Sequence, residues 1–369
     1  MATSESRPQR ESSRTLLTDK TQPELSVIVP ARDEEACLAD CLQSLVGQSG
    51  LAYEIIVVDD HSSDRTRDIA ASFPVQLIAA DPLPTGWSGK CNAVWTGAKA
   101  AKGKWLLFTD ADTQHEPNSI ASGLAEAIDC GAALLSYSPK QQVHSFAERA
   151  LMPVIFAELA ATYRPKEVSD PRSPTAAANG QYLLVRRDAY DGIGGHAAVA
   201  TTILEDVALA RLVKQAGYRL QFRVSDVVKT RMYRTFPQMW EGWTKNLALL
   251  FPHPRRLVVL RMAEFAIIVL GAALAVLMAM NGVIAGAVAP AAVAALFLVF
   301  FLLRIRRAHF DWLSNAVAIV GLPLFAILLL NSDISLNRGR VRWKGREYRG
   351  AAAGAIPEKA AEPSNSHRA

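Results

Sequence analysis

Between residues 24 and 140, short apolar runs alternate with segments whose apolar residues recur every three or four positions. The runs are rich in β-branched residues and predict strands at 25–31, 54–60, 75–80, 104–112 and 132–138. The segments between them predict amphipathic helices, as in EEACLADCLQSLVGQ. Near-continuous apolar strands that alternate with helices predict an α/β domain with a largely parallel sheet.

A second block, at about 175–230, contains NGQYLLVRRDAY, GIGGH and a predicted helix. That helix begins near Glu205 and Asp206, where acidic residues suit the helix dipole, and it stops at Gly217. Polar residues in PARDEE, DDHSSD and DAD directly follow predicted strands. Ligands bind beyond the carboxyl ends of parallel strands, so these motifs predict one shared site.

The hydrophobic pattern changes after residue 260. Segments 263–280 and 283–303 each approach or exceed the ~18–20 apolar residues that span a bilayer, and they predict a transmembrane hairpin. A third segment, 312–330, contains GLP and either crosses or turns back. A kink or re-entrant turn at Pro323 is preferred, because it keeps the basic cluster at 337–350 on the side of the hairpin's flanks.

Composition and charge agree with a membrane protein. Of 369 residues half are hydrophobic, mean hydropathy is +0.12 and net charge is +5. The basic residues flank the apolar segments instead of alternating with aromatic residues, so an anionic bilayer is the predicted partner and nucleic acid is not. Both flanks of the hairpin are predicted to be cytoplasmic because of the arginines at 255, 256, 261, 304, 306 and 307.

The cysteines and termini predict no further chemistry. Cys37, Cys41, Cys91 and Cys130 lack the spacing of a metal site, and they are interpreted as reduced thiols of a cytoplasmic domain. Residues 1–23 lack the apolar run of a signal peptide and predict a disordered N-terminus. Residues 333–369 predict a basic juxtamembrane segment followed by a disordered tail.

Asp110 and Asp112 close the predicted strand 104–112. In an extended strand, residues i and i+2 point to the same face, so the two carboxylates are expected to converge. Hard oxygen ligands suit Mg²⁺ or Mn²⁺ held together with substrate phosphates. An isolated Asp-x-Asp favours a solvated turn over a metal site, so the interpretation depends on companion residues.

Those companions lie at the other predicted strand ends and helix starts. Asp59 and Asp60 can accept hydrogen bonds from a ribose or a base, although helix capping through SSD is an alternative role. Lys90 in TGWSGKCNA can approach a phosphate, but its spacing excludes a Walker P-loop. Glu205 and Asp206 are candidate bases or ordinary helix-start acids.

Six motifs together resemble family 2 glycosyltransferases, which have the GT-A fold. They are PARDEE, VVDDHSSDRT, GWSGKCNAVWTGAKAAKGKWLLFTDADT, NGQYLLVRRDAY, GGH and LED, in the family's order and approximate spacing. The resemblance implies a GT-A domain at 24–255 and a transmembrane region at 256–332. The form GW-x-GK, the C-terminal spans and the closing W-K/R-G-R-x-Y resemble bacterial hopanoid-associated, carotenoid and ceramide glycosyltransferases, which implies a multi-pass inner-membrane protein.

The resemblance also implies roles for single residues. Pro30, Arg32 and Glu34 would line the nucleotide pocket, with Asp60 at the uracil and Asp59 beside it. Lys90 would lie near the base or the diphosphate. Asp110 would bind the ribose and approach the metal, Asp112 would coordinate Mg²⁺ or Mn²⁺, and Asp206 would be the general base.

The acceptor side departs from the family pattern. Processive members and several lipid-acceptor members carry Gln-x-x-Arg-Trp before the spans, but RMYRTFPQMWEGWTKN has Gln238 and Trp243 without an Arg-Trp pair. Candidate acceptor contacts are Glu205, His196, Trp240 and Trp243, although loop packing for the histidine and a membrane-interface position for the tryptophans are alternatives. The segment RVRWKGREY predicts either a clamp for anionic headgroups or a fold-back toward the site.

These observations predict an inverting glycosyltransferase that uses a nucleotide sugar, preferably UDP-linked, and a membrane lipid acceptor at the cytoplasmic face. Metal-assisted departure of the nucleotide diphosphate is part of that prediction. The alternatives are a polyprenyl-phosphate sugar transferase and a non-catalytic membrane protein that binds nucleotide sugars. The sugar, the lipid and the oligomeric state are not specified by these residues.

Overall fold

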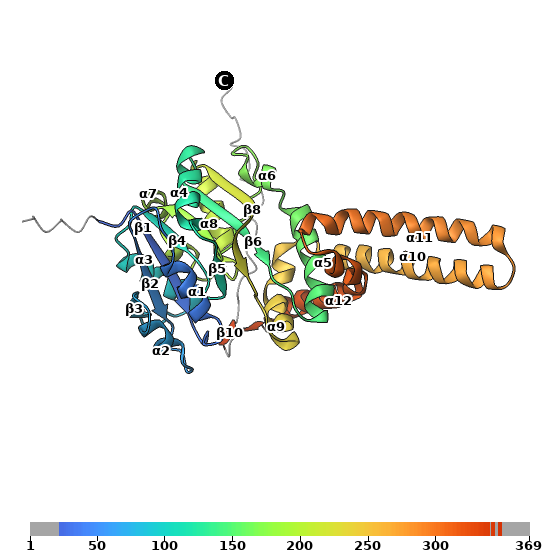
Figure 1. The fold of residues 1–369 in the computed structure, drawn as a ribbon, viewed down its shortest axis with the longest axis horizontal. Helices are drawn as coiled ribbons and strands as arrows, with labels where there is room; N and C mark the ends of the chain where they lie inside the picture. Colours follow the sequence, from blue (N-terminus) through green and yellow to red (C-terminus); the bar gives the residue numbers. More distant parts are fainter. Residues whose placement is uncertain (1–21, 340, 344–345, 349–369) are drawn as a thin grey trace, which may run out of the picture.

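A computed structural model describes residues 22–339, 341–343 and 346–348. Figure 1 shows an α/β domain from which a long helical hairpin projects. The predicted disorder of the N-terminus falls, except for residues 22 and 23, outside the described residues, as does the predicted tail after residue 348.

One eight-stranded sheet forms the centre of the domain, in the order β3-β2-β1-β4-β7-β6-β8-β5. Its strands are β1 Leu25–Ala31, β2 Tyr53–Asp59, β3 Gln76–Ala79, β4 Trp105–Phe108, β5 Thr113–His115, β6 Leu134–Gln141, β7 Leu183–Arg186 and β8 Leu220–Thr230. The β3-β2-β1-β4 half is parallel, whereas β7 is antiparallel to both β4 and β6. Strands β6 and β8 are also parallel, so four of the seven strand pairs described in this sheet are parallel and three are antiparallel. The sheet is mixed but largely parallel, as expected. The antiparallel strands β5 and β7 were not predicted, because an apolar run is the same in either strand direction.

Two helical layers cover the sheet, because successive strand residues point to opposite faces. In β4, Trp105 and Leu107 pack with α1 (Leu38–Val46), α2 (Thr66–Ala71) and α4 (Ser119–Asp129). Leu106 and Phe108 pack on the other face with α3 (Gly89–Ala100), α7 (Arg187–Gly192) and α8 (Glu205–Gln215). This layering brings the amino ends of α3 and α8 to the edge where β4 ends.

The predicted strand 104–112 is shorter in the structure. Its pairing stops at Phe108, which lies opposite Ile28 and Leu183, and the chain then turns before β5. The amide of Thr113 donates to the carbonyl of Asp110 at 3.3 Å and closes this turn. Asp110 and Asp112 thus share a turn, and the inference that extended alternation aligns their carboxylates is wrong.

Three C-terminal helices are long and apolar enough to cross a membrane: α10 Pro254–Met280, α11 Ile284–Ile305 and α12 Trp312–Asn337. The hairpin of α10 and α11 projects from the domain, whereas α12 lies at its base (Figure 1). Helix α12 packs against α5 (Phe146–Thr162), α9 (Phe236–Asn246) and α10. It continues as a helix through Pro323, so the predicted re-entrant turn at that proline is wrong.

The segment after α12 lies beside α9. Strands β9 (Val341–Trp343) and β10 (Arg346–Tyr348) form an antiparallel pair, and β9 contacts α9. This backbone position agrees with the fold-back alternative for RVRWKGREY. A short helix, α6 (Pro165–Ser169), completes the described helices and packs on β8.

A buried charge network fastens the hairpin to the domain. Glu158 of α5 lies 3.3 Å from Arg261 of α10 and 3.1 Å from Arg304 of α11. Arg304 also contacts Glu264 at 2.7 Å. The opposite charges of Glu158, Arg261, Arg304 and Glu264 hold the hairpin against α5. Removal of any one of them would leave an uncompensated buried charge. Arg261 and Arg304 therefore form ion pairs inside the protein, in addition to lying at the ends of the apolar segments.

Gly321 permits the close approach of α12 to α5. A Cβ at this position would overlap the carbonyl oxygen of Ala150, which belongs to the backbone of α5. Gly321→Ala is therefore expected to destabilise the protein by about 1–3 kcal/mol, because one helix must move away from the other. Thermal unfolding in detergent measures this effect, with Gly47→Ala as the control, since a Cβ there makes only an ordinary contact. Equal melting temperatures for the two variants would contradict the prediction.

Candidate active site

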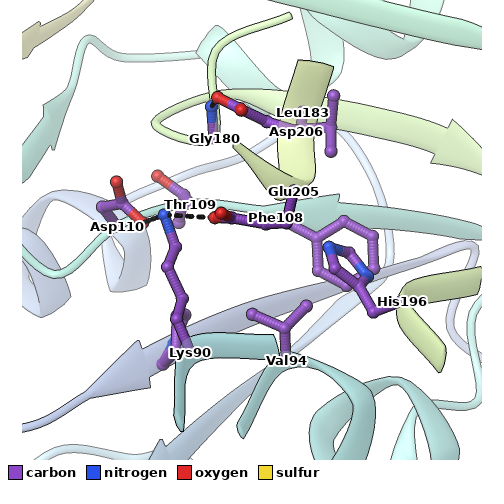
Figure 2. A pocket seen from close by; sticks show the side chains of 11 residues that line it. Lys90, Val94, Phe108, Thr109, Asp110, Gly180, Leu183, His196, Glu205 and Asp206 are labelled. Carbon is purple, nitrogen blue, oxygen red and sulfur yellow. Dashed lines mark hydrogen bonds and ion pairs between the residues drawn. The ribbon is translucent and has the colours of Figure 1, made fainter. Parts of the chain in front are cut away.

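Four charged side chains from three separate parts of the chain meet at the end of β4. Figure 2 shows Lys90, Asp110, Glu205 and Asp206 around one small cavity, which Pro30 also lines. Lys90 is in the first turn of α3, whose amino end is capped by Ser88, and the two acids begin α8. The starts of α3 and α8 and the end of β4 thus bring together residues from parts of the sequence that lie far apart.

Lys90 joins two of these acids. Its Nζ lies 2.8 Å from Oδ1 of Asp110 and 3.0 Å from Oε1 of Glu205. Burial acts to lower the pKa of Lys90, but the charges of Asp110, Glu205 and Asp206 raise it well above its ordinary value. The lysine is therefore a permanent cation in this cavity.

Asp206 is held by backbone donors. The amide of Gly180 donates to its Oδ2 at 2.9 Å, and the amide of Val207 donates to its Oδ1 at 2.8 Å. Burial and the neighbouring charge of Glu205 raise the pKa of Asp206 above its ordinary value. A fixed carboxylate with increased proton affinity has the property required of a general base. A Cβ on Gly180 would come 3.1 Å from the Nζ of Lys90, so glycine allows this loop to approach the site.

The adjacent acid has the opposite character. Burial acts to raise the pKa of Glu205, but Lys90 and then Lys245 lower it below its ordinary value. Glu205 therefore stays ionised and orients Lys90, whereas Asp206 is the better proton acceptor. Lys245 was not selected from the sequence. A sequence signal for Lys245 did exist: it lies two residues after Trp243, on the helix that carries Gln238 and Trp243 in place of the family's Gln-x-x-Arg-Trp motif.

The predicted nucleotide-pocket residues follow β1 and β2. The Asp60 carboxylate is buried, and its Oδ2 lies 3.6 Å from the Arg32 guanidinium. Asp59 accepts a hydrogen bond from the amide of Ser62 at 3.2 Å, in the loop before α2. The amide of Thr66, which begins α2, donates instead to Asp64 at 2.9 Å, so Asp64 and not Asp59 supports the start of this helix. Glu34 accepts a weak hydrogen bond from the Cys37 thiol at 3.3 Å, on the side of α1. Asp60 and Arg32 are thus paired across neighbouring strand ends.

The acceptor candidates occupy different surroundings. His196 lines the cavity, where its ring packs edge-on against Phe108 and its Nδ1 lies 2.9 Å from the Tyr190 hydroxyl. Burial lowers the pKa of His196 to about 4, so it is neutral at neutral pH.

The two tryptophans of α9 also differ. Trp243 is buried, with its Nε1 3.4 Å from the sulfur of Met152, and therefore serves packing. Trp240 is half-buried, and its ring lies 5.7 Å from that of Phe236. Gln238 accepts a hydrogen bond from the amide of Arg234 at 3.2 Å, which supports the start of the helix. Of the two, only Trp240 has an exposed ring surface for an acceptor.

The chemistry of Asp110 and Asp112 fits a divalent metal that takes its other ligands from a substrate. Both carboxylates are half-buried in one turn beside Lys90. Within the described ranges, no group of three or more His, Cys, Asp or Glu side chains forms a self-sufficient metal site. Mg²⁺ is commonly held by one or two carboxylates together with substrate phosphates, so two acids suffice at such a site.

Comparisons with known proteins agree with this geometry. Residues 26–194 match the model of Glycosyl transferase family 2. The chain is 30% identical over 255 residues to a 4,4'-diaponeurosporenoate glycosyltransferase of Staphylococcus haemolyticus (strain JCSC1435), covering 66% of this chain and 67% of that protein. It is 27% identical over 234 residues to the enzyme of the same name from Staphylococcus aureus (strain MRSA252), covering 61% and 60%.

Among solved structures, a mannosyltransferase from Pyrobaculum calidifontis in complex with GDP-Man and Mn²⁺ is 17% identical, with a TM-score of 0.49 and coverage of 86% and 87%. The predicted fold class, an α/β GT-A domain followed by apolar C-terminal helices, is confirmed. The similarity to the Staphylococcus haemolyticus enzyme and the match of the family model establish that this chain belongs to glycosyltransferase family 2.

Proposed function

We propose that this protein is an inverting glycosyltransferase that moves a sugar from a nucleotide sugar to a membrane lipid. The observation that carries the reaction type is the pairing of Asp206, a fixed carboxylate with a raised pKa, with the cation Lys90 in the same cavity. One group can take a proton from an acceptor, and the other can stabilise a phosphate. We prefer a UDP-linked donor, whose uracil base would contact Asp60 and Arg32.

The reaction then needs one displacement. Asp206 takes the proton of the acceptor hydroxyl, and the acceptor oxygen forms a bond to the anomeric carbon. The bond from that carbon to the diphosphate breaks on the opposite side, so the configuration is inverted. The electron pair of the broken bond remains on the diphosphate, whose charge Lys90 stabilises.

Asp110 and Asp112 would hold Mg²⁺ or Mn²⁺. When bound, the metal supplies positive charge to the departing diphosphate. Lys90 contacts Asp110 in the structure, so the lysine lies beside the proposed metal-binding turn and would contact the same diphosphate as the metal.

The lipid acceptor is proposed from the helices and the relatives. Three apolar helices adjoin the catalytic domain, and two relatives are named 4,4'-diaponeurosporenoate glycosyltransferase, which is a carotenoid glycosyltransferase. A domain fastened to a membrane hairpin by Glu158 and Arg304 would have short access to an acceptor dissolved in the bilayer. We place the protein in the inner membrane with its catalytic domain in the cytoplasm, because basic residues flank the hairpin.

The direct test uses purified protein in detergent, extracted membrane lipids, a set of UDP-sugars and Mn²⁺, with mass spectrometry of the lipid products. A neutral or carotenoid-linked glycolipid is expected. A sugar-phosphoprenol as the sole product would overturn the proposed acceptor and support the polyprenyl-phosphate alternative. No turnover and no donor hydrolysis under any metal condition would support a binding protein instead.

The pH profile tests the assignment of Asp206. A general base must be ionised, so activity falls as the pH falls through its pKa. The raised pKa places this acidic limb above the pH at which an ordinary aspartate titrates. Glu205→Gln removes the neighbouring negative charge and is expected to move the limb toward lower pH. The measurement is kcat against pH for the two proteins, and an unmoved limb would contradict the assignment.

A further inference from the structure

A buried polar cluster lies behind the turn that carries Asp110 and Asp112. We call it the turn-anchor cluster, and it consists of Gln48, Thr109, Thr113, His115 and Ser119. All five side chains are buried, and Thr109 and Thr113 are fully enclosed. The proposed reaction makes no use of this cluster, although polar groups in a core are costly unless they form hydrogen bonds.

Two threonine hydroxyls hold the backbone around the turn. Oγ1 of Thr113 donates to the carbonyl of Asp110 at 2.8 Å, beside the longer bond from the Thr113 amide. Oγ1 of Thr109 donates to the carbonyl of Gln181 at 2.8 Å, which connects the start of the turn to the segment before β7. The residue between the two metal-binding candidates, Ala111, is itself buried, so the turn is enclosed on its inner side.

Counting protons gives His115 a specific role. Each threonine hydroxyl has one hydrogen, and each uses it on a carbonyl, so the two oxygens face one another at 2.9 Å as acceptors. Nε2 of His115 can donate to both, since it lies 3.0 Å from the Thr109 hydroxyl and 3.4 Å from the Thr113 hydroxyl. The Cys41 thiol, 3.7 Å from the Thr113 hydroxyl, is a second, weaker donor candidate for that oxygen. The single hydroxyl hydrogen of Ser119 can go to Nδ1 of His115 at 3.2 Å or to Oε1 of Gln48 at 3.3 Å; in the first arrangement Nδ1 accepts and Nε2 carries the proton.

The surroundings of His115 support this assignment. Burial lowers the pKa of His115 to about 3, so the ring is neutral at neutral pH and carries one N–H, as the pattern requires. Its backbone amide donates to Ser44 of α1 at 3.0 Å, and Ser119 begins α4. Hydrogen bonds of the cluster and of the His115 backbone thus connect the turn to α1 and α4.

We propose that Thr113 and His115 are positioning residues, which fix the Asp110–Thr113 turn so that both carboxylates face the donor diphosphate and its metal. The inference rests on the proposed function, because it assumes a metal–diphosphate ligand. Apolar side chains of similar volume would fill the same space, but they would not fix the direction of the Asp110 carbonyl. A loose turn would lower the affinity for the metal-bound nucleotide without altering the acceptor side.

The test is calorimetric binding of UDP with Mn²⁺ and of UDP alone. Thr113→Val, which removes only the hydroxyl donor, and His115→Phe are each expected to weaken Mn²⁺–UDP binding about 10-fold. Binding of UDP alone should change by less than about 2-fold, and the KM for the acceptor should stay at the wild-type value. His115→Gln keeps one donor and one acceptor and should restore most of the affinity.

Tyr137→Phe is the matched control, because it removes a partly buried hydrogen bond of 2.8 Å, from Tyr137 of β6 to Glu126 of α4, in which no residue of the turn-anchor cluster takes part. It is expected to lower thermal stability as much as Thr113→Val does, with unchanged Mn²⁺–UDP affinity. If His115→Phe does not fold, Thr113→Val decides the question. Wild-type Mn²⁺–UDP affinity in Thr113→Val would overturn the positioning role. If the wild-type protein shows no Mn²⁺-dependent UDP binding, the proposed function fails, and the positioning role fails with it.

Discussion

Replacing Asp206 with asparagine is expected to lower kcat about 10³-fold, within the range that a general base contributes. Asparagine has nearly the same shape and can still accept a hydrogen bond from the Gly180 amide, but it cannot take a proton from the acceptor. Donor binding should remain close to that of the wild type, because Lys90 keeps its contacts with Asp110 and Glu205. The measurements are single-turnover transfer and UDP binding.

Asp188→Asn is the control for this substitution. Asp188 is also an acid in the first turn of a helix, and its Oδ1 accepts from the amide of the following residue, as Asp206 does. It lies outside the group of residues that line the cavity. Asp188→Asn should retain transfer activity. A normal rate in Asp206→Asn would show that another group is the base, and loss of UDP binding would show that Asp206 has a structural role.

Asp112→Ala is expected to remove metal-dependent turnover, with a loss of about 10³-fold or more at saturating donor, since charge stabilisation at a leaving group contributes several kcal/mol. The substitution removes one of the two proposed metal-binding carboxylates of the turn and leaves Lys90 and Asp206 in place. UDP should still bind in the absence of metal. Activity measured across a Mn²⁺ titration tests this result, together with calorimetry of UDP with and without Mn²⁺.

Gln114→Ala is a suitable neighbour for comparison, because Gln114 is half-buried in β5, two residues after Asp112. Its side chain makes only a long hydrogen bond of 3.5 Å to Asp40. This variant should keep its metal response. An unchanged Mn²⁺ titration in Asp112→Ala would remove that residue from the proposed metal site. The effect also differs from that of Thr113→Val, which should shift the titration instead of abolishing it.

Local patterns were sufficient to place most elements. The apolar runs predicted β1 with its observed limits, 25–31, and the C-terminal segments were recognised as helices of membrane-spanning length. These features depend on which residues are adjacent in the chain, because side-chain periodicity and apolar length are properties of a single segment. The motif order also selected Lys90, Asp110, Glu205 and Asp206, which the fold brings into one cavity.

Other features depend on contacts between distant segments. The direction of β7 follows from its connection and its partners, and the sheet is consequently mixed. The apolar run toward Asp112 looked like one strand, but pairing partners end at Phe108, and the acids therefore lie in a turn.

The sequence by itself thus determined the family, the order of the elements and the candidate acids, because motifs and periodicity are local. The tertiary structure decided the contrast between Glu205 and Asp206, which depends on the positions of Lys90 and Lys245. The tertiary structure also brought His115 into contact with the hydroxyls of Thr109 and of Ser119, which begins α4. Proton affinity and hydrogen-bond direction are set by neighbours in space, and no spacing along the chain specifies them.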